Sequence, residues 1–157
     1  MSSKIDRYLN LLVLDAQQVE RAKAAWTIID PHMPDLIERF YEHLLETSSK
    51  RLFESKDLYA IKSAQLVYWQ ALFAGKFEPA YQTHVNLIWE RHRATGVHMT
   101  DYIATYAWFS ERFFQYIDQA HPADPDKRQS LLKAINKVIY LDMMIATSAS
   151  NAFWVDV

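Results

Sequence analysis

A histidine that closes an apolar helical stripe is the residue of this sequence best suited to chemistry. Tyr81, Val85, Ile88 and His92 follow one another at steps of four, three and four, which places them on one face of a helix. Gly96 then supplies the left-handed position that commonly ends a helix. A neutral imidazole in such a setting can offer one ring nitrogen to a metal. By spacing alone, a histidine of the core or its rim is the commoner case, so ligation needs support from the rest of the chain.

The composition excludes several classes of function. The chain has 157 residues, which fits a single domain over 1–157, and its net charge of -2 offers no basic surface for nucleic acid or an anionic membrane. It has no cysteine, so disulfides, zinc–thiolate sites and thiol catalysis are excluded. Half of the residues are hydrophobic and 14% are aromatic, which suits a lined cavity. Because neither a signal peptide nor a membrane span is recognisable, we expect a soluble cytoplasmic protein.

No catalytic residues are expected. The sequence has no paired carboxylates with a plausible cleft, no nucleophile elbow, no phosphate-binding loop and no metalloprotease motif.

The elements that position His92 are predicted to be helices throughout. The chain has only two glycines, too few for sheets with tight turns, and its apolar residues recur at helical spacing. Asp15 and Thr100 can cap helices, while Pro31 and Pro79 suit first turns. The predicted helices span 4–13, 16–29, 35–46, 57–74, 79–95, 101–119 and 125–152.

The last predicted helix is apolar over more than one face. A helix of this kind typically contacts a second body as well as its own core. We therefore predict a homodimer through the last two helices, as a four-helix bundle. The apolar positions are Leu131, Leu132, Ile135, Val138, Ile139, Leu141, Met143, Ile145 and Ala146.

The order and spacing of several short motifs resemble the globin domain of globin-coupled sensors, over nearly the whole chain. The motifs are Arg39-Phe40-Tyr41-Glu42-His43-Leu44-Leu45, Lys62-Ser63-Ala64-Gln65, Tyr68-Trp69, Leu72-Phe73-Ala74-Gly75-Lys76-Phe77-Glu78, Tyr81, Ile88, His92-Arg93, Gly96-Val97, Tyr102, Tyr106-Ala107 and the segment from Leu132 to Met143. The resemblance implies an all-α globin fold, a three-over-three helical sandwich with an extra N-terminal helix and little or no fourth helix. It also implies haem b, iron protoporphyrin IX, as the cofactor.

The resemblance assigns roles to individual residues. His92 is the expected proximal ligand of the haem iron, and its other ring nitrogen is expected to bond either Tyr102 or a backbone carbonyl. Tyr41 is the expected distal donor to dioxygen, against the alternative of an ordinary core aromatic. The haem pocket implied by the resemblance consists of Phe40, Ile61, Ala64, Gln65, Tyr68, Ile88, Val97 and Tyr102. Ile61 and Ala64 lack a donor, and Gln65 is expected to be turned away from the distal side.

The chain departs from the family pattern on the proximal side. Trp89 stands where the family commonly has glycine, and the run after His92 is less aliphatic than usual. His84 and His98 are possible substitutes for His92, whereas His43 is expected to point elsewhere. Asp142, within an apolar run, is expected to cap a helix, pair or face a partner helix.

The resemblance implies a haem-based gas sensor rather than an enzyme. Such a domain binds dioxygen, and CO or NO as further ligands, and signals to a C-terminal output domain such as a diguanylate cyclase. The alternatives are a stand-alone globin enzyme, either a nitric oxide dioxygenase or peroxidase-like, and a haem-free helical signalling domain.

Overall fold

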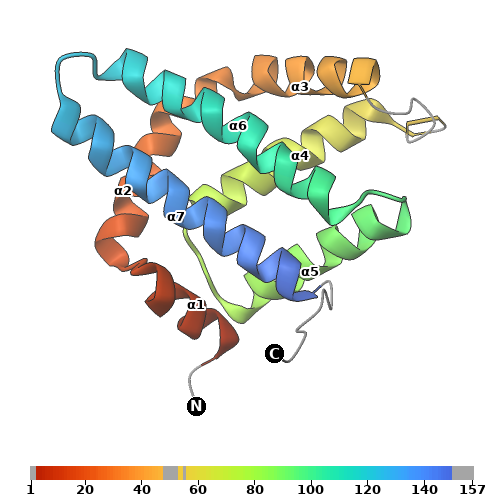
Figure 1. Cartoon of the computed structure of the whole chain (residues 1–157), viewed down its shortest axis with the longest axis horizontal. Coiled ribbons are helices and arrows are strands. Elements are labelled where there is room, and N and C mark those ends of the chain that lie inside the picture. The colour runs from red at the N-terminus through yellow and green to blue at the C-terminus, as the bar shows by residue number, and fades with distance from the viewer. Residues whose placement is uncertain (1–2, 48–52, 55, 150–157) are drawn as a thin grey trace.

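The computed structural model describes residues 3–47, 53, 54 and 56–149, and helices make up most of this part (Figure 1). No strand occurs among these residues, so the predicted all-α class is confirmed. The elements are α1 (Lys4–Leu12), α2 (Ala16–Ile29), the 3-10 helix η1 (Asp30–His32), α3 (Met33–Thr47), α4 (Leu58–Phe73), α5 (Pro79–Ala94), α6 (Met99–Ala120) and α7 (Pro125–Ala149). Between α3 and α4, the described residues 53 and 54 form a turn and no helix.

Local capping chemistry sets most of the helix starts. The Asp15 carboxylate accepts the amide of Gln18 at 2.9 Å, as predicted, and Asp57 does the same for α4. The prediction of Thr100 as a cap is wrong. The His98 carbonyl already accepts the amides of Asp101 and Tyr102, both at 3.1 Å, so the backbone begins α6 at Met99.

A proline explains a second shifted boundary. The structure begins α3 at Met33, two residues before the predicted start, and places Pro34 in the first turn. An amide in the first turn has no partner within the helix, so the missing N–H of proline costs little there.

Two glycines end the helices on either side of the predicted site. Gly75 has φ 72° and Gly96 has φ 85°, both in the left-handed region. A Cβ on Gly75 would overlap Cγ1 of Val19 on α2, whereas a Cβ on Gly96 would meet nothing within 4 Å. Gly75 therefore lets the turn between α4 and α5 press directly on α2.

The central element is α7, which runs antiparallel beside α6 (Figure 1). It packs against α1, α2, α4, α5 and α6. The apolar side chains around α7 are therefore buried against helices of the same chain. Tyr140 is the one large hydrophobic side chain of α7 that lies exposed. The breadth of that apolar surface is thus no reason to expect a second body, which corrects the sequence argument.

Aromatic side chains fill the core between α4 and α6. The Trp69 ring lies 5.0 Å from Phe109 and 5.2 Å from Phe113, centroid to centroid, and Phe73 stacks on Trp26 at 4.9 Å. Much of the aromatic content thus serves core packing rather than a cavity lining. In the described part of the chain, no helix combines the length and hydropathy needed to cross a membrane.

Candidate functional site

The His92 side chain lies in the last turn of α5, where the backbone fixes one of its ring nitrogens. Nδ1 lies 2.8 Å from the carbonyl oxygen of Ile88. Because a carbonyl can only accept, Nδ1 carries the proton of this bond, and in the neutral imidazole Nε2 keeps the lone pair. The ring also meets Tyr102 edge to face, with centroids 5.2 Å apart. Of the two partners expected for the ring N–H, the structure has the backbone carbonyl, while Tyr102 packs against the ring.

The stripe that contains His92 does not stay buried to its end. Tyr81 and Val85 are buried, Ile88 is half-buried and His92 is exposed. The buried line runs instead in steps of four from Tyr81 through Val85 to Trp89, 3% exposed, and each such step turns it by about 40° around the helix. His92 therefore lies at the edge of the stripe, and its Nε2 has no hydrogen-bond partner among the residues that the structure describes.

Trp89, the departure from the family pattern, belongs to the core. Its ring meets Tyr102 edge to face at 5.2 Å, and its side chain is buried. Its indole N–H is buried and has no hydrogen-bond partner among the described residues. Tyr102 thus lies in contact with both Trp89 and His92.

Tyr41 on α3 has a buried ring with a protonated hydroxyl. It is 7% exposed and meets Phe40 and Phe53 edge to face, at 5.3 and 6.1 Å. Burial raises the pKa of Tyr41 to about 12, so the phenol keeps its proton at neutral pH. Its hydroxyl makes no hydrogen bond to any residue that the structure describes. Tyr41 therefore has an O–H free to donate.

The α4 residues expected near Tyr41 differ in their environment. Ile61 is half-buried and Ala64 is exposed. Gln65 is half-buried, and its Oε1 is shielded from solvent with no partner in the described part of the chain. Its amide oxygen therefore faces inward rather than out to solvent. Val97, beyond the end of α5, is half-buried.

Tyr68 is committed to a different partner. Its hydroxyl donates to Asp142 of α7, as do the hydroxyls of Tyr81 and Tyr106, the Tyr81 bond measuring 2.5 Å to Oδ1. Asp142 is 0% exposed. Burial raises the pKa of this carboxyl, and the three phenol hydrogen bonds oppose the rise. Pairing is thus the outcome for Asp142, and sequence reasoning did not identify its three partners.

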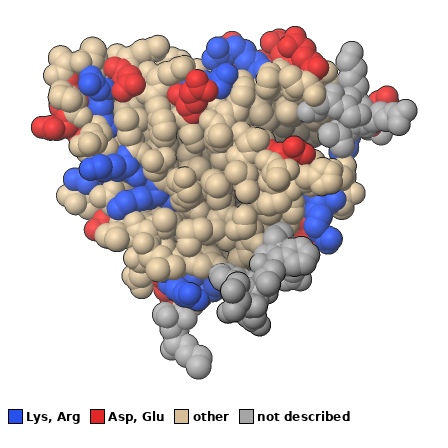
Figure 2. Space-filling model, in the orientation of Figure 1, with Lys and Arg blue, Asp and Glu red and all other residues tan. Residues whose placement is uncertain are grey.

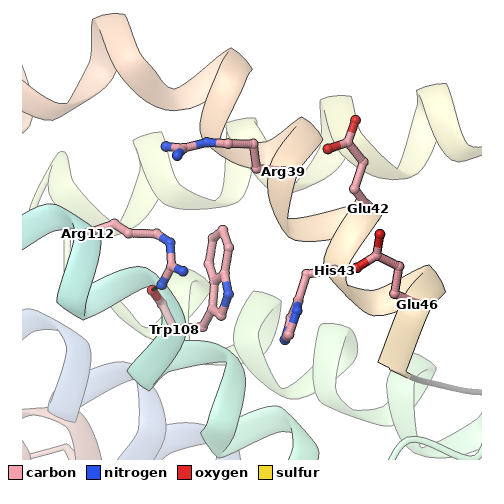
Figure 3. A pocket seen from close by; sticks show the side chains of 6 residues that line it. All are labelled: Arg39, Glu42, His43, Glu46, Trp108 and Arg112. Carbon is pink, nitrogen blue, oxygen red and sulfur yellow. Dashed lines mark hydrogen bonds between the residues drawn. The ribbon is translucent and has the colours of Figure 1, made fainter.

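Three further histidines had been considered, and the ring of one of them, His84, lies 6.0 Å from that of Tyr68. His84 and His98 are exposed, and His43 lines an open hollow of about 270 Å³ between α3 and α6 (Figure 3). In that hollow the Trp108 ring stands between the Arg112 guanidinium, 3.5 Å from its centroid, and the His43 ring. Its other lining residues, Arg39, Glu42 and Glu46, are charged, so this hollow is not an apolar slot.

Comparison with known proteins gives a family and a fold. A family model described as Protoglobin matches residues 1–151. The fold is similar to the globin domain of a globin-coupled sensor from Geobacter sulfurreducens, with a TM-score of 0.84. The two are 18% identical, and the match covers 96% of this chain and 99% of that chain. No curated protein matches. At this identity the likeness establishes the globin fold, as predicted.

Proposed function

Since the chain belongs to the protoglobin family, we propose that it is a haem-based gas-sensor domain that binds dioxygen reversibly. His92 provides the proximal ligand, and Tyr41 provides the distal hydrogen bond. The observation that carries this proposal is the bond from Nδ1 of His92 to the Ile88 carbonyl, which reserves Nε2 for a metal.

The residues of the site fit haem b. An imidazole whose second nitrogen donates to a backbone carbonyl is the usual proximal ligand of haem proteins. Half-buried apolar side chains precede and follow His92 in the chain: Ile61 and Ile88 before it and Val97 after it. These side chains would hold the porphyrin. The haem supplies an iron atom that takes a diatomic gas. The polypeptide supplies the imidazole, an apolar setting and the phenol of Tyr41.

Tyr41 sets the preference among gases. Dioxygen held in such a pocket takes on partial negative charge, while CO takes on little. A phenol that keeps its proton donates to the first far better than to the second. Tyr41 therefore favours dioxygen over CO.

A homodimer through α6 and α7 is part of the proposal. The middle of the face that these helices form carries few charged side chains (Figure 2). A hollow of about 240 Å³ there is lined by residues of both helices, including the exposed side chains of Ile103 and Tyr140. A gas that binds better to one arrangement of α5 shifts the pairing of α6 and α7 across the dimer. This change in pairing is the signal that passes to a C-terminal output domain.

The absorption spectrum of the purified protein tests this proposal. We expect a haem band in protein from iron-replete cells, which shifts reversibly when dioxygen or CO is added after reduction. A colourless but fully folded preparation would overturn the proposal in favour of a haem-free signalling domain. Rapid oxidation of the iron, with turnover of nitric oxide or peroxide in the presence of a reductase, would instead support a globin enzyme.

A further inference from the structure

The buried carboxylate of Asp142 joins four helices through phenols. Asp142 lies on α7, and it accepts hydrogen bonds from Tyr68 on α4, Tyr81 on α5 and Tyr106 on α6. The four side chains meet in the interior, where Asp142 has no exposed surface. We call these four residues the Asp142 cluster. It fixes the helix that carries His92 to the helix at the centre of the fold.

A fourth tyrosine connects the Asp142 cluster to His92. The Tyr102 ring lies 5.4 Å from the Tyr106 ring and 5.2 Å from the His92 ring, both edge to face. Burial raises the pKa of Tyr102 to about 12 and the Asp142 charge adds to the rise, while hydrogen bonding with Tyr106 and Tyr68 opposes it. Tyr102 therefore touches the cluster at one end and the imidazole at the other.

We propose that Asp142 is a positioning residue for His92, acting through the phenols that it gathers and the Tyr102 ring packed against them. The carboxylate gives Tyr68, Tyr81 and Tyr106 a common acceptor, and so fixes the surface on which Tyr102 rests. Without that acceptor, Tyr102 turns and His92 keeps only its bond to Ile88. That single bond leaves the imidazole less restricted in orientation.

The geometry favours positioning over chemistry at Asp142 itself. The carboxylate is sealed from solvent and fully engaged by phenols, so no substrate reaches it. Removing a carboxylate from water is costly, and an apolar side chain of the same size would avoid that cost. What the carboxylate supplies in return is a defined orientation for three hydroxyl groups on three helices.

Nuclear magnetic resonance of the His92 ring tests this positioning directly. Its Cε1–H resonance is identified by its loss in His92→Ala, and is followed in the reduced CO-saturated protein and in the haem-free protein. We expect Asp142→Asn and Tyr81→Phe to shift this resonance in both forms. Two exposed positions on α7 serve as matched controls, because Asp126→Asn and Tyr140→Phe leave the cluster intact. In the reduced holoprotein we also expect the iron–histidine stretching band to shift and broaden in the cluster variants alone.

An unchanged His92 resonance in folded Asp142→Asn and Tyr81→Phe protein would overturn the inference. If Asp142→Asn does not fold, Tyr81→Phe decides, because it removes one of the three hydrogen bonds and keeps the carboxylate. The inference relies on the proposed function only for the role of His92 toward iron. If the wild-type chain takes up no haem, the proposed function fails, and the haem-free resonance still decides whether Asp142 positions His92.

Discussion

The Nδ1 atom of His92 and the carbonyl oxygen of Ile88, one helical turn earlier, are 2.8 Å apart. This bond assigns the ring proton to Nδ1 and keeps the Nε2 lone pair for a ligand. It needs no side chain from another helix, because both groups belong to α5. The tautomer of His92 is therefore set locally, while the orientation of its ring depends on Tyr102.

Replacing His92 with alanine is expected to abolish haem retention, since it removes the nitrogen proposed to hold the iron. The absorption band of the purified variant measures this. His84→Ala and His98→Ala are the matched controls, because both side chains are exposed and both variants should keep the band. A His92→Ala protein with an undiminished band would move the ligand to another residue, and double variants with His84 or His98 would then identify it.

Replacing Tyr41 with phenylalanine is expected to speed dioxygen dissociation about tenfold to a hundredfold, since a hydrogen bond to a charged acceptor contributes about 1.5 to 3 kcal/mol. CO dissociation should change far less. Stopped-flow measurements with both gases make the comparison. Tyr59→Phe is the control, as Tyr59 on α4 is 81% exposed. Equal rates for wild type and Tyr41→Phe would remove Tyr41 from the mechanism.

The buried phenols are expected to make the fold sensitive to alkali. Burial holds the pKa of Tyr41 at about 12 and those of Tyr68, Tyr81 and Tyr106 well above 10.0, their ordinary value in an unfolded chain. The unfolded chain therefore loses these protons first. The stability they contribute is complete below about pH 10 and is lost as the pH rises toward the folded values.

Thermal unfolding followed by circular dichroism from about pH 8 to pH 11 checks this linkage. The melting temperature should fall steeply above about pH 10, and Tyr41→Phe should remove part of the fall, about 2 to 3 kcal/mol at its full extent. A flat profile over this range contradicts the burial of the phenols.

The two glycines are expected to differ in their response to alanine. Both lie in the left-handed region, so each substitution costs about 1 to 2 kcal/mol of backbone strain. Gly75→Ala also drives a methyl group into Val19, which adds roughly 1 to 3 kcal/mol, while the methyl group of Gly96→Ala meets open space. Urea unfolding of the two variants measures the difference. Equal losses would show that the contact between the turn and α2 relaxes freely.

The proposed dimer is expected to dissociate when charge is placed on its face. Ile103 and Tyr140 are 36% and 53% exposed beside the hollow between α6 and α7. Ile103→Glu and Tyr140→Glu should therefore shift the protein toward monomer in analytical ultracentrifugation, because they bring like charges together across the interface. Tyr59→Glu on α4 is the control. A wild-type chain that is monomeric at all concentrations tested would contradict this part of the proposal.

Local chemistry explains why most of the fold was predictable from the sequence. Helix starts are marked by Asp15, Asp57 and Pro79 through groups within three residues of each boundary. Each of these starts can therefore be predicted from the residues next to it in the sequence. The prediction of Thr100 as a cap failed because α6 had two possible first residues. The backbone carbonyl of His98 determines which one is used, and no side chain in the sequence marks it. The same limit applies to His92, whose two possible partners the sequence could name but not separate.

The Asp142 cluster lay beyond sequence reasoning for a different reason. Its phenols stand 74, 61 and 36 residues from Asp142, on three separate helices. A charged residue in an apolar run signals that a partner exists, and pairing was one of the outcomes expected. Which residues supply the partners depends on how α4, α5 and α6 cross α7, and no periodicity within one helix contains that information.

The position of α7 at the centre of the packing has a consequence for synthesis. Ribosomes release the chain from its N-terminus, so α1, α2, α4, α5 and α6 emerge before the helix against which all of them pack. Until Ala149 has left the exit tunnel, the apolar faces of these segments lack their shared partner. Completion of the tertiary structure therefore waits for α7, and nascent chains stalled within α7 should be the ones that chaperones hold longest.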